Sequence, residues 1–115
     1  MAPYDFELVL PLGIKERIDV KATSGEFQRT LHVSLAELHA MADSATPYLL
    51  YRVSEMDEQS ATLRISGPMA AFAKKLLSSL AALPAGVSPD GFSIDPGLLN
   101  FGPPVSLRLS FNGEA

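Results

Sequence analysis

Residues 17–23 read Arg-Ile-Asp-Val-Lys-Ala-Thr, a strict alternation of polar and apolar side chains. Successive side chains of an extended strand point to opposite faces, so the alternation predicts a β-strand here. Asp19 and Lys21 share one face of that strand, whereas Ile18 and Val20 share the other. We therefore expect one face to contribute to the core and the other to carry the chemistry of the molecule.

A second alternating stretch precedes this strand. Residues 4–12 alternate apolar side chains with Asp5 and Glu7, which predicts a half-buried strand. A proline and a glycine follow, and they predict a hairpin-like return of the chain. Such a return brings Asp5 toward Asp19 across the two paired strands.

Length and composition indicate one globular domain, residues 1–115. The hydrophobic content of 47% and the charged content of 19% are ordinary for such a domain. No apolar run approaches the roughly 18 residues of a membrane span. The first residues lack a basic segment followed by an apolar one, so no secretory signal is visible. We expect a cytoplasmic protein with no membrane partner.

Cysteine content and charge limit the chemistry. The chain has no cysteine, which excludes disulfides, thiolate zinc sites and cysteine nucleophiles. His32 and His39 are too few and too far apart for a convincing zinc site. The net charge of -4 argues against a general phosphate-coating protein, because non-specific affinity for nucleic acid comes from Lys and Arg. It does not exclude an enzyme whose carboxylates hold a divalent cation.

The rest of the chain predicts two helices among further strands. Ser34 and Glu37 have the spacing of a capping box, which predicts a helix over about residues 35–43. A proline opens a second predicted helix at about residues 68–83. Further strands are predicted at 29–34, 48–53, 62–66 and 105–111, and a long irregular crossing at 84–104. The order of these elements predicts an α/β (α+β) fold.

Three segments carry a resemblance to a known family: Ile18-Asp-Val-Lys-Ala-Thr, Leu31-His-Val-Ser-Leu-Ala-Glu-Leu and Tyr48-Leu-Leu-Tyr-Arg-Val. Over about residues 4–54 the chain resembles the restriction-endonuclease-like PD-(D/E)xK superfamily. It is most similar to the nuclease-like domain named for the plant protein NO VEIN. The resemblance implies a mixed central sheet flanked by helices. It also implies a helix before the first strand, and we expect that N-terminal core helix to be missing from this chain.

The same resemblance implies a site for phosphodiester hydrolysis. Asp5, Asp19 and the backbone carbonyl of Val20 would bind Mg²⁺, or Mn²⁺ in its place, because Mg²⁺ prefers oxygen ligands. Lys21 would orient or activate the attacking water and stabilise the charge that develops on the phosphate. The further residues of this expected site are Thr23 and Ser24, which would contact the DNA backbone, and Glu7, an auxiliary ligand.

Three hypotheses for the function remain open at this point. The first is a Mg²⁺-dependent endonuclease that cleaves DNA in restriction or genome defence, as a homodimer or with a larger restriction or helicase partner. The second is a catalytically degenerate nuclease-like domain that binds DNA or a protein. The third is an unrelated α+β interaction domain that pairs through the 105–111 strand. Convergence of Asp5, Asp19 and Lys21 in space would favour the first.

Overall fold

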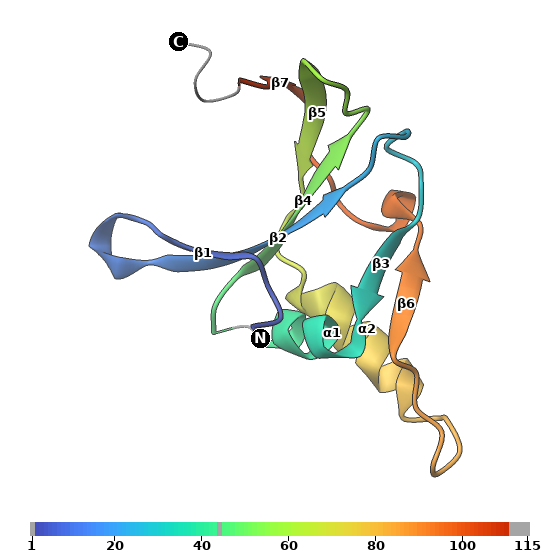
Figure 1. The fold of residues 1–115 in the computed structure, drawn as a ribbon. Coiled ribbons are helices and arrows are strands. Elements are labelled where there is room, and N and C mark those ends of the chain that lie inside the picture. The colour runs from blue at the N-terminus through green and yellow to red at the C-terminus, as the bar shows by residue number, and fades with distance from the viewer. Residues whose placement is uncertain (1, 44, 111–115) are drawn as a thin grey trace.

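The computed structural model describes residues 2–43 and 45–110, which form a five-stranded sheet, a two-stranded sheet and two α-helices (Figure 1). The elements along the chain are β1 (Phe6–Val9), η1 (Pro11–Gly13), β2 (Lys15–Ala22), β3 (Leu31–Ser34), α1 (Leu35–Ala42), β4 (Tyr48–Ser54), β5 (Ser60–Ile65), α2 (Ala70–Leu80), β6 (Gly91–Ile94), η2 (Pro96–Leu98) and β7 (Val105–Arg108). The predicted mixed α+β class is confirmed.

The larger sheet is mixed, with the strand order β1-β2-β4-β5-β7. β1 runs antiparallel to β2, so the predicted hairpin is present, and Phe6 lies opposite Ile18. β2 and β4 are parallel, with Asp19 opposite Leu50. Parallel neighbours need a crossover connection, which β3 and α1 supply. The crossover places the start of α1 beside β2.

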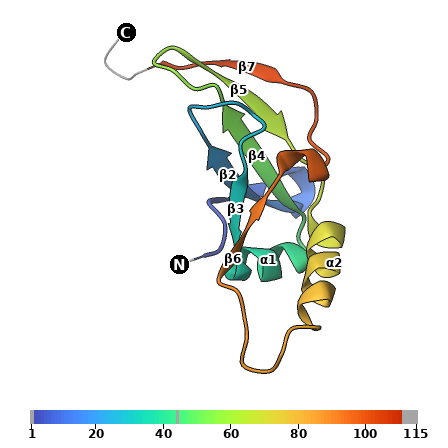
Figure 2. The ribbon, with the colours of Figure 1, turned by 90° about the vertical axis from the view of Figure 1, so that its right-hand side faces the viewer.

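The core lies where α1, α2 and β3 pack against β4 (Figure 2). In α1, Leu38 and Met41 are three residues apart and therefore share one face, and both are fully buried. Tyr48 and Leu50 of β4 are buried in the same cluster. In the part of the chain that the structure describes, neither helix has the length and apolar character needed to cross a bilayer.

β1 departs from its prediction as a half-buried strand, because all of its residues are exposed. The side chain of Phe6 is 59% exposed and that of Leu8 is 41% exposed. β1 is an edge strand, and its hairpin with β2 projects beyond the helices (Figure 1). Alternation along a strand shows which side chains share a face, but not whether another element covers that face.

The apolar run at 48–53 predicts a strand covered on both faces. In β4, however, buried residues alternate with half-buried ones. The buried face includes a charged side chain, Arg52, which is 2% exposed. One face of β4 is therefore closed, and the other is only partly covered.

The prediction that residues 84–104 form a purely irregular crossing is wrong. This segment contains β6, which pairs antiparallel with β3. β6 has only four residues and lies among prolines and glycines, so its alternation is too short to read reliably. The second helix begins at Ala70, after Pro68 rather than at it. The last predicted strand is present as β7, at the edge of the larger sheet, although Phe111 of its predicted range lies outside the described residues.

Candidate active site

Asp19 and Lys21 lie two residues apart on β2, so both side chains point to the same face, toward the start of α1. The Lys21 Nζ atom is 2.8 Å from Asp19 Oδ2. Asp19 is 4% exposed, which is unusual for a carboxylate. The polar face of this strand is therefore turned into the molecule rather than toward solvent.

Glu37 of α1 completes this group. Lys21 Nζ donates to both Glu37 carboxylate oxygens at 3.0 Å. The capping box holds the carboxylate in place, because Glu37 Oε1 accepts from the Ser34 N–H at 2.9 Å and Ser34 Oγ accepts from the Glu37 N–H at 3.0 Å. The spacing of Ser34 and Glu37 predicts only a helix start and gives no sign of the Glu37 contact with Lys21. Local spacing reveals a cap but not the strand that lies beside it.

We expect Ser34→Ala to lower the free energy of unfolding by about 1 kcal/mol, because the side chain that caps α1 is lost. In a domain of this size that change lowers the melting temperature by about 4 °C. Thermal denaturation followed by circular dichroism measures it. Ser93→Ala, on the exposed position of β6, is the matched control. Equal melting temperatures for the two variants would contradict the role of the capping box.

The Asp19 carboxyl is in an unfavourable environment for a charge. Burial raises the pKa of Asp19 to about 7; the Lys21 ammonium opposes this shift and the Glu37 carboxylate adds to it. Asp19 Oδ2 is buried, and its close neighbour among the described residues is the Lys21 ammonium, whose Nζ atom lies 2.8 Å away. A buried carboxylate is stabilised by a neighbouring cation, which Lys21 supplies here.

Lys21 and Glu37 form the stably charged pair of this group. Burial lowers the pKa of Lys21, but the Asp19 and Glu37 carboxylates outweigh burial, and the net shift is upward. Burial raises the pKa of Glu37, but the Ser34 N–H and the Lys21 ammonium outweigh it, and the net shift is downward. Asp19 is thus the member of the group whose protonation changes near neutral pH.

Asp5 lies just before β1 and beside the same part of β2. Its Oδ2 atom accepts a hydrogen bond of 2.7 Å from the N–H of Val20, the residue between Asp19 and Lys21. The N–H and C=O groups of one strand residue point to the same side, so the Val20 carbonyl points to the side of β2 on which Asp5 lies. The structure therefore brings Asp5, Asp19, Val20 and Lys21 to one corner of the sheet, which we call the carboxylate corner together with Glu37.

The Tyr48 hydroxyl lies close enough to these carboxylates to interact with their charges. It donates to the Pro3 carbonyl at 2.6 Å. Burial raises its pKa, and the charges of Asp19, Glu37 and Asp5 raise it further. One hydroxyl is therefore within electrostatic reach of the three acidic groups.

The remaining expected site residues differ in their positions. Thr23 is at the end of β2, where its Oγ1 accepts from the Gly25 N–H at 3.0 Å. Ser24 is exposed in the turn that follows. Glu7 lies away from the corner, 3.6 Å from Lys15 Nζ and 4.0 Å from Arg17 Nε. Thr23 therefore braces the turn that follows β2, whereas Glu7 pairs with basic side chains of the hairpin.

The donor set can be compared with what a magnesium ion requires. Within residues 2–43 and 45–110, no three His, Asp or Glu side chains form a metal-binding cluster by themselves. Mg²⁺, however, needs only one or two carboxylates and keeps several waters. The Asp19 and Asp5 carboxylates and the Val20 carbonyl are oxygen donors of the kind that Mg²⁺ prefers, and a bound ion would replace the Lys21 ammonium as the cation beside Asp19 Oδ2.

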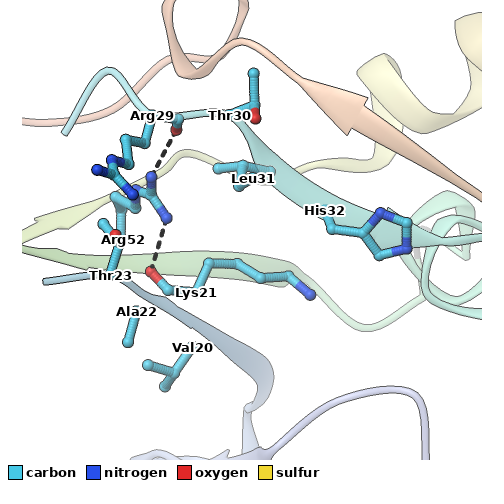
Figure 3. Close-up of a pocket in the computed structure, with 9 residues that line it drawn as sticks. All are labelled: Val20, Lys21, Ala22, Thr23, Arg29, Thr30, Leu31, His32 and Arg52. Atoms are coloured by element: carbon cyan, nitrogen blue, oxygen red, sulfur yellow. Dashed lines mark hydrogen bonds between the residues drawn. The ribbon is translucent and has the colours of Figure 1, made fainter. Parts of the chain in front are cut away.

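A cavity of about 600 Å³ adjoins the carboxylate corner, because Val20 and Lys21 of the corner also line the cavity (Figure 3). Three of its lining side chains are cationic, and none of the described residues that line it is acidic. The lining residues are Val20, Lys21, Ala22, Thr23, Arg29, Thr30, Leu31, His32 and Arg52. Lys21 is therefore shared by the acidic carboxylate corner and by a cavity whose other charged lining residues, Arg29 and Arg52, are basic.

Comparison with known proteins places the chain in a family. The model of the family described as protein NO VEIN, C-terminal, matches residues 1–65. The chain belongs to the NO VEIN C-terminal family. None of the curated proteins and none of the solved structures matches it. In this NO VEIN C-terminal chain, the matched segment contains the whole carboxylate corner and every residue that lines the cavity.

Proposed function

We propose that this NO VEIN C-terminal chain is a metal-dependent DNA endonuclease of the restriction-endonuclease-like PD-(D/E)xK superfamily, with a role in restriction or genome defence. One observation carries the proposal. Asp19 and Lys21 share a buried face of β2, and the Asp5 carboxylate lies against the backbone between them. The mixed β1-β2-β4 arrangement with a helical crossover supports the superfamily assignment.

In this proposal Asp5, Asp19 and the Val20 carbonyl hold Mg²⁺ or Mn²⁺. A bound divalent cation polarises the phosphoryl oxygen and lowers the pKa of a coordinated water. Lys21 acts as a cation that stabilises negative charge on the phosphate, because its raised pKa keeps it protonated and unable to accept a proton. Glu37 positions the Lys21 ammonium through two contacts of 3.0 Å.

Supercoiled plasmid DNA provides the direct test. We expect the wild-type chain, alone or with its restriction or helicase partner, to nick or linearise the plasmid with Mg²⁺ or Mn²⁺ and to lose this activity with EDTA. Asp5→Asn should reduce cleavage at least tenfold, on the order of the loss seen for supporting groups of metal sites. Asp90→Asn, an exposed carboxylate outside the corner, is the matched control. Intact plasmid under all metal conditions would reject the endonuclease.

A degenerate nuclease-like domain that binds DNA or a protein is the second candidate. The specific observation that favours it is that two carboxylates already neutralise Lys21 Nζ, each within 3.0 Å. A lysine neutralised in this way is less available to a phosphate. This candidate predicts that Asp19→Ala leaves the biological activity intact, whereas the endonuclease predicts that the activity is lost.

A further inference from the structure

Arg52 is a buried cation with no anionic partner among the described residues. Its Nη1 atom donates to the Lys21 carbonyl at 3.3 Å and its Nη2 atom to the Arg29 carbonyl at 2.6 Å, as Figure 3 shows. Its Nε atom has no partner, and no described carboxylate lies within ion-pair distance of its guanidinium. Burial lowers the pKa of Arg52. Because an unpaired buried charge is costly, a site of this kind is stabilised by an anion.

Arg29 adds a second cation to the same cavity, and its side chain is accessible. It is exposed and makes no ion pair with a described residue. Its side chain lies over Gly25, where a Cβ atom would overlap the guanidinium. Arg29 therefore offers a fork of free N–H donors beside the fixed charge of Arg52.

The wall of the cavity that carries Arg29 is anchored. Phe27 packs edge to face on Phe101 with 5.3 Å between ring centroids, and the Arg64 guanidinium lies 4.5 Å from the Phe27 ring centroid. The Glu55 N–H donates to the Gly25 carbonyl at 2.8 Å. With the Arg52 bond to the Arg29 carbonyl, these contacts fix the loop from both ends. A preformed wall lowers the entropic cost of binding a ligand.

The charge of the cavity is opposite to that of the whole chain. The chain has a net charge of -4, yet Arg29 and Arg52, which have no ion-pair partner among the described residues, both line a single space of about 600 Å³. That volume is within the range of small-ligand sites. Hydroxyls of Thr23 and Thr30 line the same space and supply neutral hydrogen-bonding groups. These groups match a phosphate carried on a larger molecule.

We propose that this cavity binds a phosphodiester group of a DNA strand, with Arg29 as the side chain that contacts it and Arg52 as the fixed charge behind it. The identity of the strand rests on the proposed endonuclease function. The cavity adjoins the carboxylate corner through Lys21, so the bound phosphate is a neighbour of the one to be cleaved. Arg29 thus holds the strand in register with the corner.

Binding of a fluorescent single-stranded oligonucleotide in EDTA tests this inference without any cleavage. We expect Arg29→Gln to weaken binding about tenfold or more, because a hydrogen bond to a charged group is lost. Arg108→Gln removes the same charge from the exposed edge strand β7 and should change affinity less than twofold. Gly25→Ala keeps the charge but displaces the Arg29 side chain, so it should also weaken binding.

A 5′-phosphate on the oligonucleotide distinguishes the source of the phosphate. Equal affinity with and without it supports a phosphodiester, whereas strict dependence on it, or equally strong binding of inorganic phosphate, would overturn the strand assignment. The proposal that the cavity binds a phosphodiester would be overturned if Arg29→Gln and Arg108→Gln lost affinity equally. It would also be overturned if the wild-type chain did not bind the oligonucleotide. Binding that depends on Arg29 without cleavage in Mg²⁺ supports this inference and rejects the endonuclease. If the wild-type chain cleaves DNA but Arg29→Gln binds the oligonucleotide as tightly as the wild type, the endonuclease is supported and this inference is rejected.

Discussion

Asp19→Asn is expected to reduce metal-dependent cleavage at least 100-fold and, in the same protein, to raise stability above neutral pH. The loss of cleavage follows because the neutral amide is a poor ligand for a divalent cation, and even outer groups of metal sites cost 10–100-fold when removed. Plasmid nicking rates measure the first effect. Asp90→Asn should change neither rate nor stability, since that carboxylate is exposed.

The stability effect has a definite sign. Folding raises the pKa of Asp19 from 3.8 to about 7 through burial, so the folded state binds more protons than the unfolded state between these values. The stability that this group contributes is therefore greatest at low pH and declines as pH rises through about 4 to 7. Asparagine carries no such charge.

Thermal denaturation at two pH values checks this sign. Near pH 4 the variant and the wild type should melt together, because the buried Asp19 is neutral there. Near pH 8 the variant should be more stable by on the order of 2 kcal/mol, since Lys21 retains Glu37 as its partner. Destabilisation of the variant at both pH values would show that the Asp19 contact with Lys21 outweighs the cost of burying the charge.

The second large effect is a steep pH dependence of metal binding and cleavage below neutral pH. A metal ligand must be deprotonated, and burial holds the pKa of Asp19 at about 7. Each pH unit below that value should lower the affinity for Mn²⁺ about tenfold, so that about two units cost roughly 100-fold. Binding of the ion should release about one proton at pH 6.

Isothermal titration with Mn²⁺ in two buffers of different ionisation enthalpy measures the proton release directly. Asp5→Asn is an informative comparison, because it should weaken Mn²⁺ binding without removing the buried Asp19 carboxyl. The decline of Mn²⁺ affinity with falling pH should persist in Asp5→Asn and disappear in Asp19→Asn. Affinity that is flat from about pH 5 to 8 would mean that Asp19 does not titrate with the ion.

Together these effects indicate that the buried Asp19 carboxylate lowers the stability of the folded state. Stability that is lost at a buried charge is frequently found where function requires that charge. The same reasoning applies on the other side of Lys21, where the buried Arg52 has no described anion. The two unfavourable charges lie on the two sides of one strand residue.

Strand faces and helix starts were the features most accessible to sequence reasoning. The alternation at 17–23 predicts β2 and the shared face of Asp19 and Lys21, and the Ser34 and Glu37 spacing predicts the start of α1. Each depends on residues within a few positions of one another. The exposure of β1 and the existence of β6 escaped prediction, because both depend on which distant segment lies alongside.

The sequence by itself determined which side chains stand together on β2, since the two-residue repeat of a strand is a property of the backbone. It also determined that chemistry here rests on carboxylates and lysine, because no cysteine is present. Only the tertiary structure decided that this face is buried, that Glu37 meets Lys21 and that Arg52 lies behind Arg29. These contacts join residues 16 and 23 positions apart, and their formation depends on packing rather than on local pattern.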